Sequence, residues 1–224
     1  STDLNSSPYG LFGPRIQDLL GSTYSMNQIA SPAVSLITGP IVTVLTITGS
    51  QSIFDFVQKY TFYSNNDFFI VDTNVASRGN LEIDQYNNSI MLFDKAQFSR
   101  QVSNENGLYQ TNSLSTLPTQ PQTDTNIVGV YDPHTLDSFV AFFYKDQGNL
   151  ALSNSTNISQ TGSKIRVDGQ SYSGQINSGD VFSSSIAYSF TNPTFIINSV
   201  SNLFESLTNP LNILQSTVQS NDPI

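Results

Sequence analysis

The run Ile41-Val42-Thr43-Val44-Leu45-Thr46-Ile47-Thr48 decides the fold class of this chain. Strand side chains alternate between two faces, so Ile41, Leu45 and Ile47 share one face with Thr43, and Val42 and Val44 share the other with two threonines. Counted from Ala33, the apolar stretch is interrupted by Gly39-Pro40 and falls short of the about 20 residues of a membrane span. It predicts a strand buried on one face and partly covered on the other.

The rest of the chain repeats this pattern in short β-like runs separated by turn residues, the spacing of a sandwich or barrel. Loops are predicted at 64–66, 103–107, 153–162 and 177–180. The Thr/Gln/Pro-rich stretch 113–125 could separate two subdomains, but 224 residues also fit one large all-β sandwich. The predicted strands are Ile53–Tyr63, Asp67–Asp72, Ser89–Phe93, Asn126–Tyr131, Leu136–Tyr144, Lys164–Val167 and Val181–Phe190.

The two ends differ from the middle. Residues 1–32 are rich in Pro and Gly, with a short candidate helix at Ile16–Leu20, and read as a tail. We therefore divide the chain into an extended N-terminal segment, 1–48, and a sandwich head, 49–224. A C-terminal amphipathic helix ending at Asn209-Pro210 could cover one end of the sandwich. Its apolar positions, three or four residues apart, are Ile196, Val200, Leu203, Phe204 and Leu207.

The composition points to an exterior protein. Ser, Asn, Thr and Gln fill 91 of 224 positions, whereas charged residues make up 11% and cysteine is absent, against roughly a quarter charged residues in a typical domain. Amides and hydroxyls do not titrate, so this surface suits an acidic medium as well as an ordinary extracellular one. The start at Ser1 indicates a mature secreted protein from which a signal peptide was removed. The 25 Phe and Tyr residues supply a core and argue against disorder.

Four Asn-x-Ser/Thr sequons predict covalent N-glycans in place of any cofactor. Asn154 and Asn157 are the more persuasive pair, because they lie in the most polar stretch of the chain. The predicted glycosylation sites are Asn5, Asn87, Asn154 and Asn157.

Catalytic and metal-binding patterns are weak, and we expect no enzyme, no cofactor and no metal. The single histidine, His134, follows Asp132-Pro133 and is predicted to lie in a turn. The segment Gly169–Gly174 lacks the second glycine of a nucleophile elbow. Glu82 and Asp84 could form an acid pair, yet their spacing fits a solvated strand face. Eight scattered basic residues give no footprint for nucleic acid.

An apolar strand close to a flexible N-terminal segment suggests a way in which copies of the chain could assemble. A sandwich that lacks a strand can be completed by an extended segment of another copy, and such head-to-tail contacts generate an open filament. The competing view makes 34–48 simply the first internal strand, and Tyr9–Leu20 is a second donor candidate. The donor-strand residues are Val34, Leu36, Ile37, Ile41, Val42, Val44, Leu45 and Ile47.

In these features the chain resembles the subunits of archaeal thread filaments, which are similar to bacterial chaperone-usher pilins. The shared features are the Ser1 start, the sequons, the polar Tyr-containing surface, the absence of Cys and the strand 41–48. Type IV pilins and archaellins begin with a long apolar helix, and the polar residues 1–8 of this chain do not fit that pattern. The resemblance implies an Ig-like or pilin-like head and donor-strand linkage between identical subunits. It also implies an extracellular role in adhesion or cell contact.

Two other functions stay open at this point. One is a surface-layer-associated or viral coat sandwich without strand exchange, and the other is an acid-stable secreted hydrolase.

Overall fold

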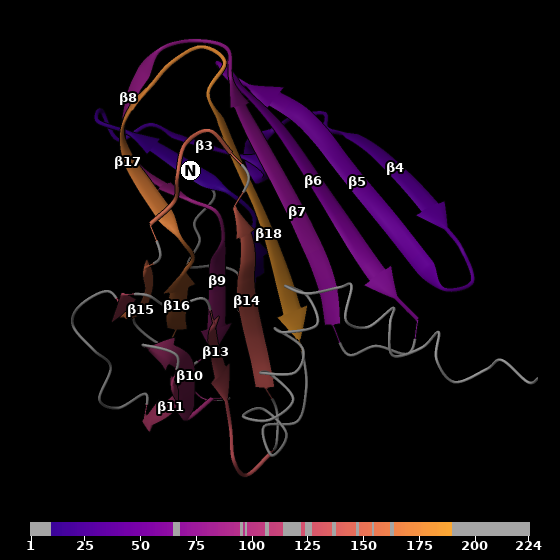
Figure 1. Cartoon of the computed structure of the whole chain (residues 1–224), viewed down its shortest axis with the longest axis vertical. Helices are drawn as coiled ribbons and strands as arrows, with labels where there is room; N and C mark the ends of the chain where they lie inside the picture. Colours follow the sequence, from indigo (N-terminus) through magenta and orange to yellow (C-terminus); the bar gives the residue numbers. More distant parts are fainter. Residues whose placement is uncertain are drawn as a thin grey trace, which may run out of the picture.

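The computed structural model describes residues 10–189 except 65–67, 95, 97, 106–107, 114–121, 124–126, 136–137, 147, 154 and 162–163. The described chain is almost entirely antiparallel β-sheet, which confirms the predicted all-β sandwich (Figure 1). One short 3-10 helix, η1, spans Met26–Gln28.

A nine-stranded sheet forms one complete layer of the sandwich. Its strands run β11-β10-β13-β14-β18-β7-β6-β5-β4. The ten-residue strands β7, β6 and β5 lie side by side next to the edge strand β4 (Figure 1). The bounds in that order are Leu108–Ser113, Arg100–Glu105, Ile127–Tyr131, Ser138–Asp146, Val181–Ser189, Phe68–Ser77, Phe54–Tyr63, Val42–Gln51 and Ala33–Thr38.

Two smaller sheets make up the opposing layer. The first runs β1-β9-β16-β15-β12 and the second runs β17-β8-β2-β3. The first sheet has the bounds Gly10–Phe12, Ile90–Asp94, Lys164–Asp168, Ser155–Thr161 and Gln122–Thr123. The second has the bounds Ser171–Ile176, Leu81–Asn87, Arg15–Asp18 and Thr23–Ser25.

Two clusters of buried side chains join the layers. In the first, Phe139 and Tyr188 of the large sheet pack with Phe93 and Ile165 of the five-stranded sheet. In the second, Phe56 and Phe182 pack with Ile83, Tyr86 and Ile16 of the four-stranded sheet. A smaller third cluster includes Ile70 and Ala187, which by strand alternation lie on the other face of the large sheet.

The strongly apolar strands agree with the sequence prediction. All seven predicted strands, and the deciding run at 41–48, fall on β5, β6, β7, β9, β13, β14, β16 and β18. The turn at 177–180 is also present, closed by the Asp180 N–H donating to the Asn177 carbonyl at 3.0 Å.

Three local predictions were wrong. Ile16–Leu20 is no helix: Ile16 is fully buried in β2 and pairs with Tyr86 of β8. The loop predicted at 153–162 contains β15, and the one at 103–107 contains the end of β10. In β15 the buried Thr156 and Ile158 alternate with Asn157, a period of two that the polar composition concealed. The C-terminal helix predicted at 196–207 lies outside the described residues.

The division at residue 48 also needs correction. The boundary falls inside β5, and residues 10–48 contribute strands to all three sheets. The described part of the predicted tail is therefore part of the sandwich, because its apolar side chains close one of the two cores.

Candidate functional site

The structure resolves the weak catalytic candidates as structural features. The Asp132 carboxylate accepts the His134 N–H at 2.7 Å and the Thr135 N–H at 3.2 Å, so His134 is an exposed residue of an Asx turn. These two hydrogen bonds, with the His134 bond the larger effect, lower the pKa of Asp132. This arrangement confirms the predicted turn.

The acid pair and the glycine-rich segment also lie on strands. Glu82 and Asp84 are exposed on one face of β8, as predicted for a solvated face. Ser171 begins β17, which pairs with β8, so Gly169–Gly174 has no strand-turn-helix geometry.

The sequons differ in accessibility. Asn87 is only 3% exposed at the end of β8, so its side chain offers no room for a glycan in the folded chain. Asn157 is partly exposed and shares the outer face of β15 with Ser159. Asn5 and Asn154 lie outside the described residues. Glycosylation at Asn157 therefore stays a prediction that the geometry permits.

A shallow polar groove of about 330 Å³ crosses β6, β7 and β18. The Asp72 carboxylate lies 3.9 Å from the Lys59 ammonium and accepts the Ser185 hydroxyl at 2.6 Å. Nearby, burial, with a contribution from the Asp72 charge, raises the pKa of Tyr144 to about 12. Because Lys59 and Asp72 already pair with one another, neither offers an isolated charge to a ligand.

The more informative surface begins at the free edge of the large sheet. Leu36 lies opposite Leu45, Leu45 opposite Tyr60, Tyr60 opposite Val71, and Val71 opposite Ile186. Directly opposite residues share a face, so these five form one cross-strand row. Its exposure falls from 64% at Leu36 to 3% at Val71 and 1% at Ile186. The row starts in solvent and ends in the core.

Aromatic side chains continue the same face. Phe62 is 39% exposed and stacks on Phe69 at 5.3 Å, and Phe69 stacks on the buried Tyr188 at the same separation. We name the exposed part of this surface the hairpin face. It consists of Val34, Leu36, Leu45 and Phe62.

Among the residues that the structure describes, the opposing layer covers one end of this hairpin. Ile29, which follows η1, lies over β5 so closely that a Cβ at Gly49 would come within 2.8 Å of its side chain. Ile47 packs against the second core cluster. Leu45 and Leu36, farther along the hairpin, lie beyond this cover.

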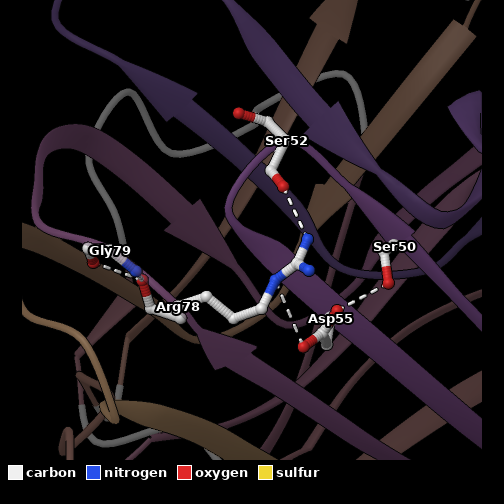
Figure 2. A network of polar contacts seen from close by, with 6 residues as sticks. Ser50, Ser52, Asp55, Arg78 and Gly79 are labelled. Carbon is white, nitrogen blue, oxygen red and sulfur yellow. Dashed lines mark hydrogen bonds and ion pairs between the residues drawn. The ribbon is translucent and has the colours of Figure 1, made fainter.

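A polar network fixes the covered end (Figure 2). The Arg78 guanidinium donates to the Ser52 carbonyl at 2.7 Å and lies 3.4 Å from the Asp55 carboxylate, which accepts the Ser50 hydroxyl at 2.5 Å. Ser52 adopts a positive φ of 55° in the β5–β6 turn. The network thus ties this turn to the start of the β7–β8 connection and holds the base of the hairpin.

The hairpin face also lies in a segment without charge. None of the 36 residues from Leu19 to Phe54 is Asp, Glu, Lys or Arg, although the whole chain carries a formal charge of −9. Sequence reasoning identified the apolar residues of β4 and β5 but missed Phe62. Its strand was predicted, but its exposure depends on how far the opposing layer extends, which periodicity does not reveal.

The described residues contain neither a cluster of metal-binding side chains nor a membrane-spanning helix. No three His, Cys, Asp or Glu side chains gather where they could hold a metal ion. No helix within the described ranges has the length and apolar character needed to span a bilayer.

No model of a known protein family matches this sequence, and no curated protein matches it. Solved structures do share its fold. The GH36 α-galactosidase AgaB from Geobacillus stearothermophilus matches with a TM-score of 0.54 at 10% identity, over 85% of this chain and 30% of that one. AgaA from the same organism gives 0.53 at 11% identity over 85% and 31%. The α-galactosidase from Lactobacillus brevis gives 0.53 at 8% identity over 85% and 30%.

These matches show a shared fold, and the chain spans about 30% of the length of each of these enzymes. They correct the prediction of a pilus-like filament subunit, because the matching structures are domains of α-galactosidases. The strand pairing explains the error. The predicted donor strand is β4–β5, a hairpin already built into its own sheet next to β6. Its residues are apolar because the hairpin forms part of that sheet.

Proposed function

We propose that this chain is a non-catalytic β-sandwich domain that works by contact between its hairpin face and another protein surface. The observation that carries the proposal is the cross-strand row from Leu36 to Ile186, which continues the core face into solvent. The buried end of this row packs against the opposing layer, but no described residues pack against its exposed end.

The energetics favour such a contact. Fully burying one Val, Leu or Phe side chain contributes about 1.5–3 kcal/mol. Val34 and Leu36 are 61% and 64% exposed, so much of that free energy is still available to a partner. Contiguous exposed apolar surface rimmed by polar residues marks interaction sites in soluble proteins. Here polar residues of the rim on the same face are Thr38 and Thr43.

The fold matches support the idea that the chain is one domain of a larger protein. In the matching α-galactosidases this fold accounts for about 30% of the chain. We place that larger protein outside the cell, consistent with the scarcity of charge and the sequon at Asn157. In this proposal the domain supplies contact surface, and no reaction is assigned to it.

Hydroxyl-radical footprinting tests the contact. The isolated chain, kept dilute, is compared with the protein purified in its natural assembly, and labelling of individual side chains is measured by mass spectrometry. Leu36 and Phe62 should be labelled several-fold less in the natural assembly. Leu20 is 93% exposed in the β2–β3 turn and serves as the internal control. Equal labelling of Leu36 and Phe62 in both samples would refute the proposal.

A further inference from the structure

Along the outer edge of β4, some backbone N–H and C=O groups have no strand partner within the described chain. Within the described chain β4 pairs only with β5, at the outer end of the large sheet (Figure 1). The Gly39 N–H donates to the Val42 carbonyl at 2.9 Å, at the hairpin connection. Hydrogen-bonded pairs alternate along an antiparallel ladder. The N–H and C=O groups of Val34, Leu36 and Thr38 therefore point away from β5.

This edge also lacks the usual protection against strand addition. Exposed edges are commonly blunted by lysine, by proline within the strand or by a bulge. Pro32 and Pro40 flank β4 without interrupting it, and the pairing of β4 with β5 is regular over all six residues. No charged side chain lies on either strand.

The charge distribution favours a second copy of the chain as the occupant. Two chains that each carry a formal charge of −9 repel one another over most approaches. The 36-residue segment without charge is where two copies can meet with the least repulsion. An apolar edge within a neutral segment of a strongly acidic protein fits its own copy without any complementary basic surface.

The strand is self-complementary in register. A two-fold axis perpendicular to the sheet and midway between the two edges pairs Leu36 with Leu36 of the second copy, and Val34 with Thr38 of the second copy. These are the residues whose backbone groups point outward, so the pairing can form a hydrogen-bonded ladder. Directly opposite residues share a face, so two hairpin faces join into one apolar surface across the axis.

We propose that two copies of the chain associate through their β4 edges, as an antiparallel pair centred on Leu36. This inference rests on the proposed function, because edge pairing leaves both hairpin faces open and enlarges the surface that another protein would cover. The contact uses the same patch on both copies and closes after two. It therefore joins complete sandwiches without exchanging a strand and gives no filament.

Sedimentation velocity of the full chain from about 1 to 500 µM tests the proposal, a range chosen because small interfaces bind weakly. The wild type should change from monomer to dimer and stop there. Leu36→Asp places two carboxylates opposite one another at the axis, so the dissociation constant should rise at least tenfold. Leu36→Pro, which removes an outward N–H at the axis, should weaken the dimer similarly.

Ile41→Asp is the matched control. Ile41 is 69% exposed, close to the 64% of Leu36, but lies in the hairpin connection outside the paired strand. It introduces the same charge and should change the dissociation constant less than about twofold, as a surface change away from the contact. Circular dichroism melts establish that each variant is folded.

Three results would overturn the dimer. They are a wild type that stays monomeric throughout, an equal loss with Ile41→Asp, and a mass that keeps growing beyond two copies. A monomeric wild type whose Leu36 and Phe62 are nevertheless shielded in the natural assembly would remove the second copy as partner and leave the proposed function standing. If the wild type stays monomeric and Leu36 and Phe62 are also not shielded in the natural assembly, both the dimer and the proposed function are refuted.

Discussion

At the scale of single residues, Asp18 shows how a carboxylate is kept ionised in a protein with few charges. Its carboxylate accepts the Ser22 N–H at 2.8 Å, the Leu20 N–H at 2.9 Å and the Tyr24 hydroxyl at 3.0 Å. Burial raises the pKa of Asp18, but these hydrogen bonds, led by Ser22, outweigh it and lower the pKa overall. The charged form therefore stabilises the β2–β3 turn.

The effect of Asp18→Asn should depend on pH. A carboxyl whose pKa is lowered by folding contributes stability above its ordinary pKa of about 3.9, and loses that contribution as the pH falls through the lower folded value. The variant should unfold at lower urea concentration than the wild type near neutral pH, and the difference should shrink in acid. Asp84→Asn, on the exposed face of β8, is the control. A difference that stays constant with pH would contradict this account.

Gly129 is required by a close approach of two strands. A Cβ on Gly129 would lie 2.4 Å from the Phe139 carbonyl oxygen and 2.9 Å from the Val140 Cα, both backbone atoms of β14. Gly129→Ala should therefore destabilise the fold by about 1–3 kcal/mol or more, as overpacking does. Gly79→Ala, whose Cβ would meet only the flexible Ile53 side chain at 3.2 Å, should cost much less. Equal losses in urea unfolding would argue against the strand spacing described.

At the scale of elements, two of the three phenylalanines on one face of β6, Phe56 and Phe62, have different surroundings. Phe56 is 1% exposed beneath the four-stranded sheet, whereas Phe62 is 39% exposed on the hairpin face. Phe56→Ala should cost about 3–5 kcal/mol, as for other fully buried phenylalanines. Phe62→Ala should cost less than half as much in the dilute isolated chain. Similar losses in chemical denaturation would mean that the opposing layer covers the whole strand.

Sequence periodicity predicts those elements whose burial is decided by their own residues. β5, β6, β13 and β18 are apolar enough to be identified alone, and all are present. β15 and β2 were not predicted, because their polar or mixed residues form strands only by pairing with neighbours such as β16 and β8. The position of β4 at the edge of the sheet was not predicted either. Its apolar residues predict pairing, but only the sheet order shows which strand it joins.

At the scale of the whole molecule, the candidate site was half predictable. The sequence singles out the apolar residues of 34–47, and a contact role for those of the hairpin face stays a prediction. Their assignment to strand exchange was wrong, because alternation cannot distinguish an exchanged strand from the edge of a complete sheet. The 36-residue neutral segment, by contrast, can be read from the sequence directly.

The non-catalytic assignment predicts no glycosidase activity in the isolated chain. Retaining glycosidases hold two carboxyl groups about 5–5.5 Å apart around the bond that is cleaved. In β8 the Glu82 and Asp84 side chains lie on an exposed strand face instead. Incubation with nitrophenyl α- and β-glycosides, including the α-galactoside, should release no more nitrophenol than a blank. Turnover abolished by Glu82→Gln or Asp84→Asn would overturn the assignment.

The most direct measurement is a crystal or cryo-electron-microscopy structure of the protein in its natural assembly. Leu36 and Phe62 should be buried there beneath another protein surface, while Leu20 remains exposed. The proposed contact would be contradicted if Leu36 and Phe62 faced solvent in the assembly as they do in the single chain, where they are 64% and 39% exposed.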